Sequence, residues 1–234
     1  FTVDNAFLLP IDHSSYYFDY TSSDESVAKV DGGEVKVVGE GQAVITAKLE
    51  DLDVSGTITV TGVQPPDTAA DPPTLPAEDV ISMFSDVYAD VPVDTWRAEW
   101  GGSTAILEEV VVAGSNNKLY SSLNFVGIIF ESVMIDASQM THLHMDVYAP
   151  SGTNFRVKLG SFPPSLTTGV ETGDLILDAN TTPAFNSGVW SSLDIPLEDF
   201  ELPAGEWDWS HIGQMVLSTT DAQLVLVDNV YWHK

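Results

Sequence analysis

Flat aromatic side chains are the residues of this sequence best suited to hold a ligand by contact alone. The chain has six tryptophans, and Trp207 and Trp209 lie in the polar stretch 205–210. Their i, i+2 spacing turns both rings the same way if this stretch is extended. Such rings stack on the apolar C–H faces of sugars, while polar neighbours bond to the hydroxyls. We therefore predict an exposed aromatic pair here. A hydrophobic lid over the core is the alternative.

The other tryptophans divide into two groups. Trp96 and Trp100 flank Arg97-Ala98-Glu99 in a second irregular stretch, and for them ligand contact and packing both stay open. Trp190 precedes an alternating strand and Trp232 lies inside the last one. For this second group we predict a packing role.

The run His142 to Tyr148 alternates polar and apolar residues, so its polar members share the face turned away from the core. Three interpretations of this face stay open. His144 could line a concave sugar-binding surface. His142 and His144 could form a metal pair of the kind that begins the metal site of jelly-roll enzymes. The face could also simply be solvated.

Acidic residues near the first and last strands of the larger domain suggest a structural calcium site. Asp86, Asp90 and Asp94 follow the first strand, and Asp228 lies in the last. Carboxylate oxygens are the ligands that Ca²⁺ prefers. We predict Asp86, Asp90 and Asp228 as ligands, although 35 acidic residues will also place some together by chance.

Motifs that carry catalysis are missing from the sequence. It has no G-x-S-x-G elbow, H-E-x-x-H, phosphate loop or dinucleotide fingerprint. Glu108-Glu109 and Glu198-Asp199 are paired acids, but neighbours on a strand point to opposite faces and cannot bracket a glycosidic bond. We predict that this protein is not an enzyme.

The strongly acidic composition excludes several classes of binding partner. The formal net charge is −27, with 8 basic residues and 35 acidic ones. Such a field repels nucleic acid, anionic membranes and acidic polysaccharides, but it does not affect a neutral glycan. No apolar run is long enough for a membrane span, and no leader precedes Phe1. The missing initial Met suggests a processed or excised chain, and the absence of cysteine is common in secreted bacterial proteins.

Residues 1–62 are predicted to form a small antiparallel sandwich. Short alternating strands are expected over 35–38, 43–47 and 56–60, with glycine turns at 32–33 and 39–41. The segments D-E-S-V-A-K-V, G-E-V-K-V-V and G-Q-A-V-I-T-A resemble, in this order, a bacterial immunoglobulin-like domain of group 2. The resemblance implies a spacer without chemistry of its own.

Five prolines mark residues 63–77 as an extended linker. Residues 78–234 then form the larger domain, an all-β jelly-roll sandwich. Its strands are expected over 79–84, 104–112, 119–130, 142–148, 155–159, 189–195, 214–218 and 224–232. Residues 114–117 are predicted as a loop between two of these strands, and residues 160–188 as an irregular excursion that could help shape a binding surface.

The larger domain has a resemblance of its own. The stretches D-V-I-S-M-F-S-D-V-Y (79–88), M-T-H-L-H-M-D-V-Y (140–148), W-S-S-L-D-I-P-L (190–197) and L-V-D-N-V-Y-W (226–232), with Trp96 and Trp100, are similar to β-sandwich carbohydrate-binding modules. These modules occur in Bacteroidota laminarinases and surface glycan-binding proteins. The resemblance implies a neutral polysaccharide or oligosaccharide ligand, first of all a laminarin-type β-1,3-glucan. It also implies an extracellular, outer-membrane-anchored location and glycan-uptake proteins as partners.

Two other functions stay open. One is a metal-dependent jelly-roll enzyme built on His142 and His144, and the other is a structural adhesion segment.

Overall fold

The computed structural model describes residues 2–3, 7–8, 17–63, 66–222 and 224–234. The chain forms two compact units, Phe1–Gln64 and Pro65–Lys234. The all-β prediction is confirmed, because the described residues form strands and short 3-10 turns only. None of the described helical turns has the length and apolarity to span a membrane.

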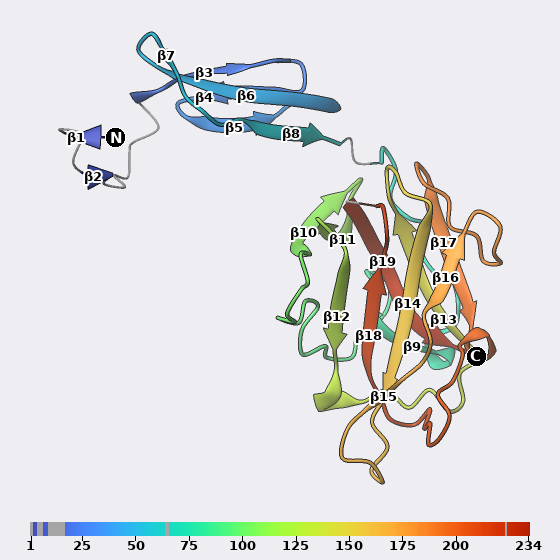
Figure 1. The fold of residues 1–234 in the computed structure, drawn as a ribbon. Coiled ribbons are helices and arrows are strands. Elements are labelled where there is room, and N and C mark those ends of the chain that lie inside the picture. Colours follow the sequence, from blue (N-terminus) through green and yellow to red (C-terminus); the bar gives the residue numbers. More distant parts are fainter. Residues whose placement is uncertain (1, 4–6, 9–16, 64–65, 223) are drawn as a thin grey trace. The chain divides into compact units, whose positions relative to one another are not determined.

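The first unit is built from short antiparallel strands (Figure 1). The strand β6 (Gly41–Leu49) is central and pairs with β3 (Asp19–Ser22), β7 (Leu52–Asp53) and β8 (Ile58–Gly62). Two hairpins stand apart from this sheet: β1 (Thr2–Val3) with β2 (Phe7–Leu8), and β4 (Ala28–Asp31) with β5 (Glu34–Val37). Among its described residues, the buried core consists of Val27, Ala28, Ala43 and Ile45.

The second unit is a sandwich of two antiparallel sheets (Figure 1). The six-stranded sheet contains β9 (Val80–Phe84), β10 (Ile106–Val112), β11 (Ser115–Ser121), β13 (His142–Tyr148), β17 (Trp190–Pro196) and β19 (Leu224–His233). The five-stranded sheet contains β12 (Phe125–Ile129), β14 (Asn154–Ser161), β15 (Val170–Glu171), β16 (Leu175–Asp178) and β18 (Ile212–Ser218).

Alternation of apolar and polar residues along the strands determines which face of each sheet packs into the core between the two sheets. In β13 the apolar residues Leu143, Met145 and Val147 enter the core, so its polar residues face outward. In β14 the core residues are Phe155, Val157 and Leu159, which leaves residues 154, 156 and 158 outside. Each sheet therefore has one buried face and one outward face, and the outward faces are the places to look for a binding site.

Three expected elements differ from the structure. Residues 119–130 are two strands, β11 and β12, because Ser122 has a left-handed φ of 52° that ends the first. The turn after β10 is at Ala113 and Gly114, and residues 115–117 already belong to β11. The excursion 160–188 contains β15 and β16, which extend the sheet beyond β14.

Residues 66–76, predicted as part of a linker, lie on the second unit; we call them the docked segment. The Thr68 carbonyl accepts a hydrogen bond from Trp190 Nε1 at 2.8 Å, and the Leu75 carbonyl accepts one from the Tyr88 hydroxyl at 2.9 Å. Ala70 is buried. Carbonyls of this proline-rich segment therefore accept hydrogen bonds from side chains of the second unit, which was not expected of a linker.

Candidate functional site

Part of the outward face of the six-stranded sheet is covered by the docked segment. Tyr148 and Leu226 form an apolar cluster there with Trp190, whose ring nitrogen holds the docked segment. Farther along, Asn229 Nδ2 donates to the carbonyl of Asp71, in the docked segment, at 3.3 Å. A ligand has no free access to this part of the sheet.

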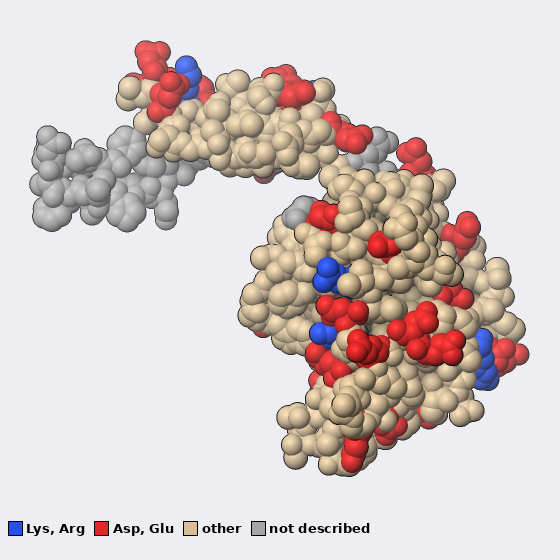
Figure 2. Space-filling model, turned by 45° about the vertical axis from the view of Figure 1, so that its right-hand side comes forward, with Lys and Arg blue, Asp and Glu red and all other residues tan. Residues whose placement is uncertain are grey.

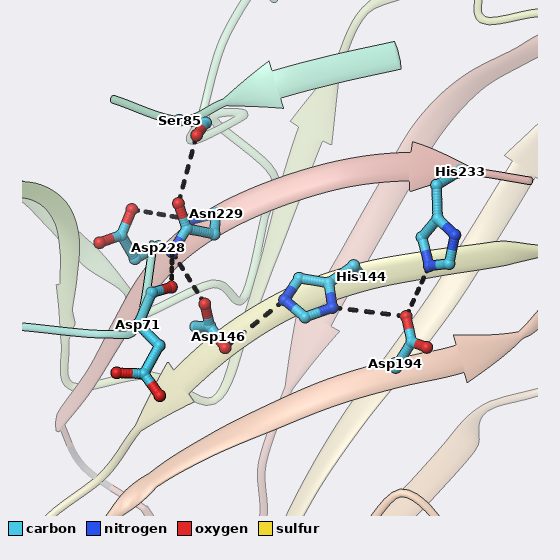
Figure 3. Close-up of polar contacts among 8 residues, drawn as sticks. All are labelled: Asp71, Ser85, His144, Asp146, Asp194, Asp228, Asn229 and His233. Atoms are coloured by element: carbon cyan, nitrogen blue, oxygen red, sulfur yellow. Dashed lines mark hydrogen bonds and ion pairs between the residues drawn. The ribbon is translucent and has the colours of Figure 1, made fainter. Parts of the chain in front are cut away.

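A chain of polar contacts continues from Asn229 across this covered face (Figure 3). Asn229 Nδ2 also donates to Asp146 at 2.8 Å, and His144 lies between Asp146 (3.5 Å) and Asp194 (3.4 Å). His233 Nε2 lies 2.7 Å from the same Asp194 oxygen. Burial opposes the ionisation of Asp194, but the hydrogen bond with His233 and the electrostatic influence of the neighbouring imidazoles lower its pKa overall.

His144, predicted to face a sugar, is therefore only 9% exposed. Its ring stacks on Tyr231 with centroids 4.5 Å apart, and Tyr231 is in turn covered edge-on by Tyr88. His142 stacks on His233 instead of pairing with His144. Among the residues that the structure describes, no three His, Asp or Glu side chains are arranged to hold a metal ion.

The outward face of the five-stranded sheet is open by comparison. Arg156, Lys158 and Val216 on its central strands are half-buried, and Ile176 on the edge strand β16 is 46% exposed. Neighbouring strands lie about 4.8 Å apart, so the face from β12 to β16 is roughly 15 Å wide. This is the face on which an extended ligand could lie.

Trp100 lies on this open face. Its six-membered ring covers Gly127 of β12, where an added Cβ would meet ring carbons at 2.6 Å. The Trp100 and Ala98 amides fix the local backbone, since Ala98 N–H donates to the Gly127 carbonyl at 2.8 Å and Trp100 N–H to the Ala98 carbonyl at 2.8 Å. The ring is half-buried, so part of it remains available for contact.

Charged side chains on the same face are paired with one another. Lys158 Nζ lies 3.2 Å from Asp174 Oδ1 and 3.6 Å from Glu171 Oε2, and Arg156 Nη1 lies 3.8 Å from Asp174 Oδ2. Gln214 Nε2 donates to Glu171 Oε1 at 2.7 Å. Acidic side chains gather across the larger unit with basic ones beside them in the view of Figure 2. These pairs offer donors and acceptors without a strong local charge.

Comparison with known proteins gives structural neighbours only. No protein-family profile and no curated protein matches the chain. A family 30 carbohydrate-binding module is 16% identical over 66% of this chain and 98% of its own, with a TM-score of 0.49. A family 30 module of a cellulosomal cellulase of Clostridium thermocellum is also 16% identical, over 66% of this chain and 97% of its own, with a TM-score of 0.49.

A third neighbour, described as showing promiscuous specificity of carbohydrate-binding modules of the β-sandwich superfamily, is 11% identical over 93% of this chain and 86% of its own, with a TM-score of 0.42. The structural neighbours are thus β-sandwich carbohydrate-binding modules.

The predicted aromatic pair lies elsewhere on the larger unit. Trp207 and Trp209 are half-buried and pack against the core. Their rings meet edge to face, with centroids 5.2 Å apart and an angle of 79°, so they do not form one flat surface. Trp207 Nε1 is buried without a hydrogen-bond partner in the described part of the chain.

Trp96 also packs against the core, beside Phe84. Of the four tryptophans predicted as candidates, Trp100 is therefore the one seated on the open face. Trp232 is fully buried, as expected.

Two of the three predicted calcium ligands come together. The Ser115 hydroxyl lies 3.1 Å from Asp86 Oδ2 and 2.8 Å from Asp228 Oδ2. Burial raises the pKa of Asp228, and the charges of Asp146 and Asp86 add to this effect, although hydrogen bonds from Ser115 and Asn229 oppose it. The third, Asp90, instead accepts a hydrogen bond from Ser82 at 2.6 Å. Asp94 is bound by Ser132.

Arg156, Lys158 and Gln214 were not predicted from the sequence as part of the site. A signal for two of them exists, since Arg156 and Lys158 alternate with buried residues in a chain with only 8 basic residues. Gln214 and Gly127 carry no such signal, because their roles depend on which strand lies beside them.

Proposed function

We propose that this protein binds a neutral polysaccharide, without catalysis, across the open face of the five-stranded sheet. The observation that carries the proposal is the Trp100 ring, seated on Gly127 beside a row of paired polar side chains. An indole ring suits the apolar face of a sugar, and donors and acceptors in compensating pairs suit its hydroxyls. On the other sheet, the docked segment and Tyr88 cover the outward side around Trp190, Asn229 and Tyr231.

The finer parts of the proposal are supported by the sequence. The resemblance of residues 78–234 to modules of laminarinases favours a laminarin-type β-1,3-glucan and a Bacteroidota source. The immunoglobulin-like pattern of residues 1–62 supports a spacer role for the first unit. We propose accordingly that the protein works outside the cell, on an outer-membrane anchor beside glycan-uptake proteins.

Replacement of the Trp100 ring tests the proposed function. Trp100→Ala should weaken binding of a β-1,3-glucan oligosaccharide about tenfold or more, because one stacked ring contributes about 1–3 kcal/mol. The Tm should change little, since the ring lies on the outside of the sheet. Isothermal titration beside thermal melts measures both quantities.

Trp190→Ala is the matched control on the covered face. It should lower the Tm and leave the affinity unchanged, because Trp190 holds the docked segment. Equal binding by Trp100→Ala and the parent protein would remove Trp100 from the site. Binding of no neutral glycan by the parent protein would refute the function itself.

We also propose a structural calcium ion near Asp86 and Asp228. Two observations support this proposal. Both carboxylates lie within hydrogen-bond distance of the Ser115 hydroxyl. The buried Asn117 Oδ1 lacks a hydrogen-bond partner among the described residues. A ligand that binds only the folded state stabilises it, so chelation with EDTA should lower the Tm. Asp86→Asn should reduce this shift, and Asp90→Asn should leave it unchanged. An identical melt with and without EDTA argues against the ion.

A further inference from the structure

A polar pocket of about 530 Å³ lies at one end of the open face. Its floor is made by the facing pairs Asn154–Asp178 and Arg156–Ile176 of β14 and β16. Its walls are the two loops that meet at this end of the strands, residues 152–153 and 179–187. The volume is in the range of pockets that hold small ligands.

Hydrogen bonds hold both walls in place. Thr153 N–H and the Thr153 hydroxyl donate to the Asp221 carboxylate at 3.0 and 2.7 Å, which fixes the first loop. In the second loop, the Thr181 hydroxyl accepts from Asp178 N–H at 3.0 Å, and the buried Phe185 ring stacks on Phe155. A pocket formed before its ligand arrives loses little free energy to ordering.

Several groups in the pocket remain available to a ligand. The side chains of Asn180 and Asn186 are exposed, and neither has a hydrogen-bond partner among the residues that the structure describes. Asp178 and Arg156, the latter already beside Asp174, bring one negative and one positive charge to the lining, and the exposed Ile176 brings an apolar surface. Amides and one side chain of each charge around an apolar surface suit a neutral polyhydroxylated ring, and the opposite charges give an anion no net attraction.

The position of the pocket indicates which part of a glycan it receives. β14 begins at Asn154 and β16 ends at Asp178, so the open face stops where the loops rise. We infer that the pocket binds the terminal sugar of the polysaccharide, so that the protein recognises chain ends. This inference rests on the proposed function and specifies how the same face is used.

The test compares an intact linear β-1,3-glucan with the same glucan after partial acid hydrolysis, which supplies more chain ends per unit mass. Isothermal titration with the full 234-residue protein should give a number of bound protein molecules per unit mass of glucan that rises with the number of glucan chain ends. In the double variant Asn180→Ala/Asn186→Ala, affinity for a short oligosaccharide should fall about 30-fold, the loss expected for two neutral hydrogen bonds. Its Tm should equal that of the parent.

Gln139→Ala, which removes an exposed amide that does not line the pocket, is the control and should bind like the parent. The inference would be overturned if the amount of bound protein followed the mass of glucan and not its number of chain ends. It would also be overturned if the double variant bound the oligosaccharide with the affinity of the parent. In both cases the Trp100-dependent binding of the proposed function would stand. Binding of neither glucan sample by the parent protein would instead refute the proposed function, and this inference with it.

Discussion

Trp100 can lie against the five-stranded sheet because position 127 has no side chain. The ring occupies the space where a Cβ would be, at 2.6 Å from two ring carbons. Contacts this short force one partner to move. Trp100 stands in a loop, so its ring is the partner expected to yield.

Gly127→Ala should therefore displace the Trp100 ring and weaken glucan binding by about the same factor as loss of the ring, tenfold or more. The tryptophan emission should shift to longer wavelength as the ring enters water. Gly101→Ala is the matched control, because no residue other than its chain neighbours lies within 4 Å of a Cβ there. Parental affinity in Gly127→Ala would show that the ring position does not matter for binding.

Strands were the most predictable elements, and the reason is their alternation. His142–Tyr148 is one strand with the predicted bounds, because three apolar residues alternate with polar ones over its full length. The stretch 119–130 was predicted as one strand although it contains two, since apolar residues continue through the left-handed turn at Ser122. Alternation identifies the faces of a strand but not its ends.

The candidate site was less predictable because it depends on which face is covered. The polar residues of β13 have the expected outward orientation, yet the docked segment and Tyr88 cover that side. Proline content in residues 66–76 predicts an extended backbone. It does not predict where the carbonyls of that backbone find donors.

The docked segment makes a prediction about the limits of the larger unit. A chain that begins at residue 66 should melt like the second unit of the intact protein, whereas a chain that begins at residue 78 should be less stable by about 2–4 kcal/mol. The loss comes from three hydrogen bonds to the rest of the second unit, each worth about 1 kcal/mol, and from exposure of the cluster around Trp190. Denaturant unfolding of the two chains measures the difference.

Trp190→Phe in the chain that begins at residue 66 separates the contribution of the hydrogen bond from that of the apolar cluster, because it removes the Trp190 hydrogen bond and keeps an aromatic ring. It should cost about 1 kcal/mol. Equal stability of the chains that begin at 66 and 78 would mean that the docked segment contributes nothing to the fold.

The whole molecule carries a net charge of −27, which opposes its own compact state. Salt screens this repulsion, since the Debye length falls to about 10 Å at 0.1 M. We expect NaCl to raise the Tm, by about 2–4 °C for each 1 kcal/mol of relieved repulsion. Affinity for a neutral glucan should not change over the same range of salt.

KCl at equal ionic strength is the control, because simple screening does not distinguish the two cations. Calorimetric melts from low to high salt check the effect. A Tm that falls with salt would mean that favourable ion pairs such as Lys158–Asp174 outweigh the net repulsion.

Chain connectivity makes the docked segment the part of the second unit that feels mechanical tension first. A pull on residue 65 reaches the carbonyls of Thr68, Asp71 and Leu75 one after another, so the three hydrogen bonds break in turn and not together. Peeling of this kind takes little force, and residues 66–76 reach roughly 35–40 Å when fully extended. The sandwich and its open face stay folded meanwhile. When the N-terminal side of the docked segment is pulled while the open face is bound to a fixed polysaccharide, the docked segment lengthens before the force acts on the binding contacts.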